Sequence, residues 1–214
     1  MAELSRQLGR RSDPVSGAIL KRLIEGLEGA DHFVGDVRDD FLEVLDLTIR
    51  FVRHHYDIER REASPQLAYL FWHTGEGDPP LEEALARDYH AHLQIFTMQS
   101  RARHEVRGIG TGRVDVLIAY GTHEFSAEIK RELRGASREG LGRYLRQAAS
   151  YPASGVRLGL LIVLDLTPKP DGVEAVEALM YVDIVPGVST DDLPRHIVVA
   201  KVPSNRPVPS DLSR

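Results

Sequence analysis

The 214-residue chain contains no cysteine. Disulfide bonds, thiolate zinc sites and cysteine-ligated iron–sulfur clusters are therefore excluded. Any metal ion must be held by carboxylate, imidazole, carbonyl or water ligands. Hard ions that prefer oxygen ligands, such as Mg²⁺ or Mn²⁺, fit that restriction best.

The sequence also has no long apolar run and no excess of basic charge. No segment approaches the roughly 18 apolar residues that a membrane helix needs, and the first residues lack the apolar stretch of a secretory signal. A cytoplasmic location is therefore expected. The net charge of -5 argues against a uniformly basic nucleic-acid surface, although a local basic groove on an acidic body stays compatible with it. With 42% hydrophobic residues the chain can bury a sizeable core.

The hydrophobic pattern divides the chain into two parts and a tail. Residues 1–75 have apolar residues at helical spacing and are expected to form a helical extension. Residues 78–203 are expected to form an α/β domain with a mixed sheet flanked by helices, and 204–214 a flexible tail. The helix at the start of the domain is expected to have Asp78 as its N-cap and Pro79 at its first position. Strands are predicted near 102–108, 113–120, 123–133, 157–167, 177–185 and 195–202, with a second core helix from 138.

A hairpin is predicted around Gly121-Thr122, with glycine at the first loop position as a type II′ turn prefers. In that register Tyr120 pairs with His123, and counting outward places Asp115 opposite Glu128. Side chains alternate along a strand, so Glu128 and Lys130 share one face, while the other face is apolar.

Facing carboxylates need a compensating charge. Directly opposed residues have Cβ atoms about 4.5–5.5 Å apart, where like charges are destabilising. A bound divalent cation would offset the repulsion. The alternative is a solvated sheet face on which Lys130 and Arg113 neutralise the acidic residues.

These residues resemble the PD-(D/E)xK nuclease superfamily, in the branch that is RecB-like. The Asp115 position lies in "GRVDV", the Glu128 and Lys130 positions lie in "EIK", and Val114 replaces the proline of the family name. "QAASY" resembles the Gln-x-x-x-Tyr signature of that branch, through Gln147 and Tyr151. The resemblance implies a restriction-endonuclease-like fold, with a helix, a three-stranded meander, a helix and a further strand over about residues 78–167.

The resemblance also implies a metal site and roles for its residues. Asp115, Glu128 and the Ile129 carbonyl would hold Mg²⁺ or Mn²⁺, and Lys130 would orient the attacking water or stabilise charge at phosphorus. Gln147 and Tyr151 would position the lysine or the substrate. The family often adds a helical glutamate, here Glu82 or Glu83. Glu82 is favoured because it lies beside the core-facing stripe of its helix, although acidic residues in a first turn also serve the helix dipole.

The function expected from this resemblance is metal-dependent hydrolysis of phosphodiester bonds, in DNA rather than RNA. A nuclease subunit or effector of a bacterial restriction or defence complex is the expected context. The rival is a catalytically inactive binding or assembly module, with the N-terminal helices contacting a protein partner; self-association stays open. A hydrolase of small phosphoesters has little support. Arginines that surround the second core helix and the first strands are expected to form a solvated face, or to bind phosphates if they converge on the carboxylates.

Overall fold

The computed structural model describes residues 13–58, 64–96, 100–109, 112–120, 122–150, 155–187 and 192–206. Six strands form one open sheet in the order β1-β2-β3-β4-β6-β5. Their bounds are β1 (Ser100–Ile109), β2 (Gly112–Tyr120), β3 (His123–Glu132), β4 (Leu158–Asp165), β5 (Met180–Val185) and β6 (Arg195–Pro203). β1, β2 and β3 are antiparallel neighbours, β3, β4 and β6 run parallel, and β5 is antiparallel to β6. The predicted α/β class with a mixed sheet is confirmed.

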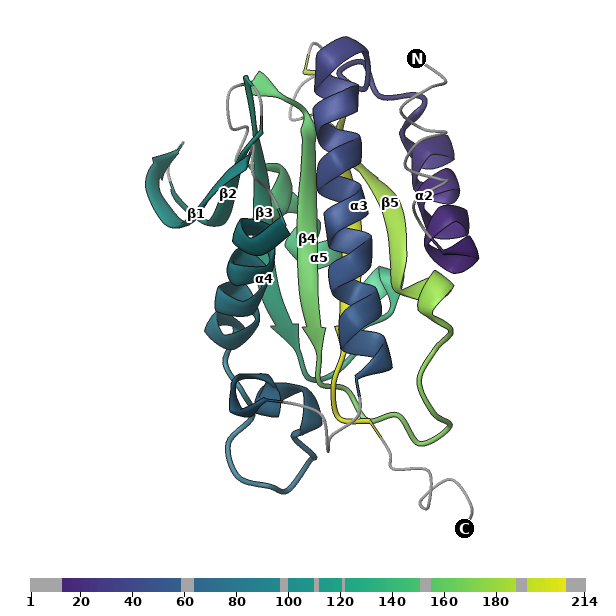
Figure 1. Ribbon diagram of the computed structural model, residues 1–214, viewed down its shortest axis with the longest axis vertical. Coiled ribbons are helices and arrows are strands. Elements are labelled where there is room, and N and C mark those ends of the chain that lie inside the picture. The colour runs from purple at the N-terminus through teal and green to yellow at the C-terminus, as the bar shows by residue number, and fades with distance from the viewer. Residues whose placement is uncertain are drawn as a thin grey trace.

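Helices cover both faces of the sheet (Figure 1). On one side lie α2 (Pro14–Leu27), α3 (Gly35–Asp57) and α4 (Glu82–Phe96), with the 3-10 helix η1 (Pro65–Phe71) between α3 and α4. The helix α5 (Arg138–Ala149) packs on the other side, against β3, β4, β5 and β6. None of the helices in the described ranges is long and apolar enough to cross a membrane.

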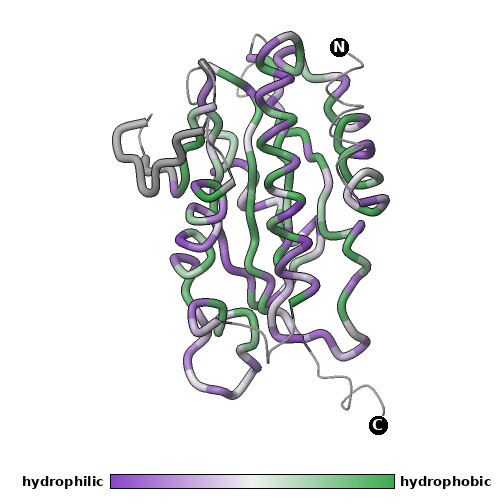
Figure 2. The backbone as a smooth tube through the Cα atoms, in the orientation of Figure 1, coloured by the Kyte–Doolittle hydropathy of each residue, from purple (hydrophilic) through white to green (hydrophobic). Residues whose placement is uncertain are grey.

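The sheet centre is apolar on both faces. All eight residues of β4 are buried, as expected for a strand enclosed between two helical layers. Figure 2 shows β4 as a hydrophobic segment, whereas α3 alternates between hydrophobic and hydrophilic residues. The core on the α3 side joins residues of α2, α3 and α4 with those of the sheet. The helices of the predicted extension are therefore continuous with the core of the α/β part.

Two predicted boundaries are wrong. The helix expected to start at Asp78 and Pro79 starts at Glu82, because Pro80 disfavours helical geometry at the residue before it. The expected flexible tail does not begin at 204. Ser204 and Asn205 are buried, and the Ser204 hydroxyl donates hydrogen bonds to the carbonyls of Tyr69 and Leu70. Residues 207–214 of that predicted tail lie outside the described residues.

Candidate functional site

The hairpin has the predicted register, and its two strands separate at the predicted carboxylates. Backbone pairing runs from Tyr120 with His123 to Val116 with Ala127. Beyond that pair β2 stays with β1, and the expected pairing of Asp115 with Glu128 is not formed as part of the ladder. The Asp115 side chain instead accepts a hydrogen bond from the Ile129 backbone N–H, with 2.9 Å between Oδ2 and N. A carboxylate thus replaces the ladder partner that β3 loses.

Glu128 lies on β3 at this separation and is nearly inaccessible. Its side chain is 2% exposed, and the Lys130 Nζ lies 2.5 Å from its Oε1. Neither carboxylate oxygen has a hydrogen bond of good geometry within the described part of the chain. Burial raises the pKa of Glu128 to about 7, and the nearby Asp115 carboxylate adds to the increase while Lys130 opposes it.

Lys130 is the cation of the cluster. Its ammonium also lies 3.9 Å from Asp115 Oδ2, and its side chain is 14% exposed. Burial disfavours the charged form, but the contact with Glu128 and the fields of Glu82 and Asp115 outweigh it and raise the lysine pKa. Lys130 is therefore held as a charged group among three carboxylates.

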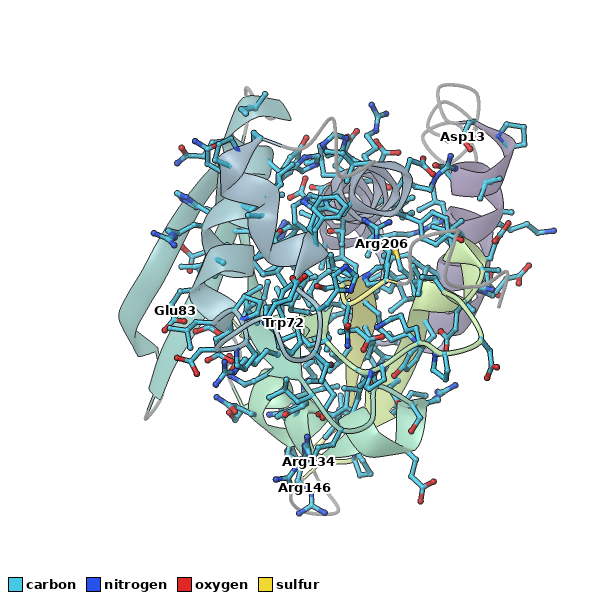
Figure 3. The ribbon with its side chains drawn as sticks, turned by 90° about the horizontal axis from the view of Figure 1, so that it is seen from below. Asp13, Trp72, Glu83, Arg134, Arg146 and Arg206 are labelled. Atoms are coloured by element: carbon cyan, nitrogen blue, oxygen red, sulfur yellow. The ribbon has the colours of Figure 1, made fainter. Side chains whose placement is uncertain are left out.

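Glu82 joins the cluster from the first turn of α4. It is half-buried, and the Arg131 backbone N–H faces its carboxylate closely enough to lower its pKa. Burial raises its pKa; Lys130 opposes the increase, and Asp115 adds to it. Glu83 is exposed and lies at the outer margin of α4 in Figure 3. The structure thus places Glu82 beside the site and Glu83 away from it.

The residues fit a divalent cation by their chemistry, although the present side-chain arrangement pairs them with a lysine. Within the described ranges no three histidine, aspartate or glutamate side chains are grouped closely enough to hold a metal ion. The buried Glu128 oxygens without hydrogen bonds are, however, the kind of acceptor that an oxygen-liganded ion uses. The Ile129 carbonyl points to the same side of β3 as its N–H, where β2 has separated. A cation there would take over the compensation that Lys130 now provides.

The helical pair predicted to assist is not brought to the site by the described contacts. Gln147 lies on α5 with an exposed side chain. Tyr151 lies outside the described residues. Their predicted positioning role stays a prediction.

The arginines around the second core helix are partly committed to structural contacts. Arg143 binds the buried Glu132, Arg138 pairs with Asp183, and Arg131 donates to the carbonyls of Pro79 and Pro80. Arg134 and Arg146 are exposed and lie at the margin of the α5 layer in Figure 3. The side chains of the predicted arginines in β1 and at the start of β2 lie outside the described part. Among the arginines whose side chains the structure describes, Arg131 is the one whose backbone N–H faces a carboxylate of the cluster, that of Glu82.

Arg131 and Glu132 are the residues near the site whose roles the pattern did not predict. The contacts of Arg131 with Pro79 and Pro80 join residues 52 and 51 positions apart, and no local spacing indicates them. Glu132 continues the alternation of Glu128 and Lys130 along β3, which could have placed it on the same face.

Comparisons with protein-family models, with curated proteins and with solved structures find no match for this chain. The chemical interpretation of the site therefore depends on its geometry and on the sequence pattern.

Proposed function

We propose that the protein is a Mg²⁺- or Mn²⁺-dependent nuclease that hydrolyses phosphodiester bonds, with DNA as the first substrate to test. The observation that carries the proposal is the buried Glu128, at the place where β2 and β3 separate, whose polar contact among the described residues is the Lys130 ammonium alone. Lys130, Asp115 and Glu82 surround it from three different elements. A buried carboxylate in that position costs stability unless a cation compensates its charge, and such perturbed groups are common at functional sites.

The element order adds support. α4, the meander β1-β2-β3, α5 and the parallel strand β4 follow one another as the restriction-endonuclease-like fold requires. In this proposal the carboxylates of Asp115 and Glu128 and the Ile129 carbonyl hold the ion, and Glu82 contributes directly or through water. A bound ion of this class lowers the pKa of a ligated water and stabilises negative charge on phosphoryl oxygens.

The chain's own groups have separate tasks in the proposed reaction. The Ile129 N–H fixes the Asp115 carboxylate, leaving its other oxygen for the ion. The Lys130 ammonium lies beside the Glu128 and Asp115 carboxylates. With Glu128 compensated by a cation, the Lys130 ammonium would be available to stabilise charge that develops at phosphorus.

The second candidate is a catalytically inactive binding or assembly module. The observation that favours it is the contact between Lys130 and Glu128, because this ion pair compensates the buried carboxylate without a metal. The apolar faces of α2 and α3 are buried in the core, so a protein partner would bind their outer, polar faces. A role as the nuclease subunit of a restriction or defence complex also belongs to the proposal, since a partner would then supply target recognition.

The decisive experiment compares the wild type with Lys130→Ala on plasmid, single-stranded DNA and RNA in Mg²⁺ and in Mn²⁺. Removing the ammonium is expected to slow cleavage about 100-fold or more, the usual cost of one group that stabilises transition-state charge. Lys21→Ala is the matched control, because Lys21 is exposed and the ion pair that it forms among the described residues is with Glu25 on the same helix. Cleavage by Lys130→Ala at the wild-type rate would refute the site. A folded wild type that neither cleaves nor binds either ion would favour the binding module.

A further inference from the structure

The segment that precedes α4 is attached to strand β3 by one side chain. The Arg131 guanidinium donates through Nη1 to the carbonyls of Pro79 and Pro80, at 3.2 and 3.2 Å. Proline fixes its own backbone φ, so the two-proline segment is stiff. Holding both prolyl carbonyls therefore sets the point and the direction from which α4 begins.

The same residue faces the first residue of α4 with its main chain. The Arg131 N–H lies toward the Glu82 carboxylate and lowers its pKa, on the side of β3 from which β2 has separated. Asp115 binds the Ile129 N–H two residues earlier on the same side. Along the edge of β3 that β2 leaves, the Ile129 N–H thus faces Asp115 and the Arg131 N–H faces Glu82. The Arg131 side chain in addition holds the segment that leads into Glu82.

We propose that Arg131 is the positioning residue for Glu82, and that this contact sets the affinity of the site for its divalent ion. The inference deepens the proposed nuclease function and rests on it. Arg131 acts through Glu82, because its guanidinium is committed to the two prolyl carbonyls on the α4 side of the strand. This positioning role differs from the phosphate binding considered for the arginines around the second core helix, α5.

The test measures Mn²⁺ affinity by electron paramagnetic resonance for the wild type, Arg131→Ala, Glu82→Gln and the double variant. Arg131→Ala keeps the backbone N–H but releases the prolyl carbonyls, and should weaken Mn²⁺ binding roughly tenfold, as loss of a supporting contact does. The double variant should bind no more weakly than Glu82→Gln, because the arginine acts through the glutamate. Arg131→Lys, which keeps a donor, should recover part of the affinity. Arg134→Ala, with the same charge loss at an exposed position, should match the wild type.

Two outcomes would overturn the inference. One is equal Mn²⁺ affinity in Arg131→Ala and Arg134→Ala. The other is an additive loss in the double variant, which would indicate a general structural role. If the wild type bound no Mn²⁺, the proposed function and the metal-affinity part of the inference would both fail. Hydrogen exchange at the residue-131 amide would then test separately whether the Arg131 side chain positions Glu82. Faster exchange in Arg131→Ala would still establish that the side chain positions Glu82, and unchanged exchange would refute that as well.

Discussion

Two glutamates on strand β3 are almost equally buried and yet have opposite environments. Glu128 and Glu132 share one face of the strand, and their exposures are 2% and 1%. Glu132 accepts hydrogen bonds from the backbone N–H groups of Arg134 and Gly135, from Arg143 and from the Tyr144 hydroxyl. Within the part of the chain that the structure describes, the polar contact of Glu128 is with Lys130 alone.

The difference in donors reverses the effect of burial on the two carboxyl groups. Burial alone would raise the pKa of Glu132, but the backbone donors and Arg143 outweigh it and lower that pKa. No such set of donors opposes burial at Glu128, and its pKa is raised to about 7. Glu132 has the environment of a structural carboxylate, which fastens the loop after β3 and the helix α5 to the sheet. Glu128 has the environment of a carboxyl group with a perturbed pKa, which is the kind of group that the proposed cation site needs.

The largest expected effect separates the two glutamates by activity. Glu128→Gln should slow metal-dependent DNA cleavage at least about 100-fold, because the amide cannot supply the negative charge that a divalent ion requires. Glu132→Gln should retain cleavage within a few-fold when assayed at a temperature where it is folded. The measurement is the initial rate of plasmid cleavage in Mg²⁺. Similar rates for the two variants would remove the functional distinction between the glutamates.

Local pattern was sufficient to predict the elements that carry this comparison. Alternation along residues 123–133 and the Gly121-Thr122 loop predicted the strand, its register and the shared face of Glu128 and Lys130, because these features depend on near neighbours in the chain. The buried run of β4 likewise follows from its composition.

What the pattern did not predict depends on contacts between distant segments. Where β2 separates from β3, the Asp115 side chain accepts the hydrogen bond of the Ile129 N–H, an exchange that alternation does not encode. The donors around Glu132 come from a loop and from α5, and the attachment of Pro79 and Pro80 to Arg131 joins residues 52 and 51 positions apart. Burial of Ser204 likewise depends on η1, whose carbonyls it binds.

A smaller effect is expected on the free energy of unfolding, and here substitution of Glu132 should cost more than substitution of Glu128. Glu132→Ala should lower the free energy of unfolding by about 2–3 kcal/mol, since it leaves buried donors without an acceptor. At pH 5, where the raised pKa keeps the Glu128 carboxyl protonated in the folded protein, Glu128→Gln should change it by less than about 1 kcal/mol, since a neutral acid is replaced by a neutral amide of similar shape. Urea denaturation in the presence of a chelator measures both. A larger loss at Glu128 than at Glu132 would show that the ion pair with Lys130, not the donor set, stabilises this strand.

The smallest expected effect is in the pH dependence of stability, where the two glutamates should act with opposite sign. A carboxyl whose pKa is raised on folding binds its proton more tightly in the native state, so the contribution of Glu128 is present below its unfolded pKa of about 4.5 and is lost as the pH rises toward 7. Glu132 has a lowered pKa, so its contribution is present above the unfolded value and is lost as the pH falls.

In metal-free solution, Glu128→Gln should therefore flatten the fall in stability between about pH 5 and 7, by roughly 1–3 kcal/mol over that window. Glu132→Gln should leave that window unchanged and flatten the loss at lower pH. Unfolding curves recorded from pH 4 to pH 8 distinguish the two slopes, and a wild-type stability that rises between pH 5 and 7 while Glu128→Gln does not would contradict the environment assigned to Glu128.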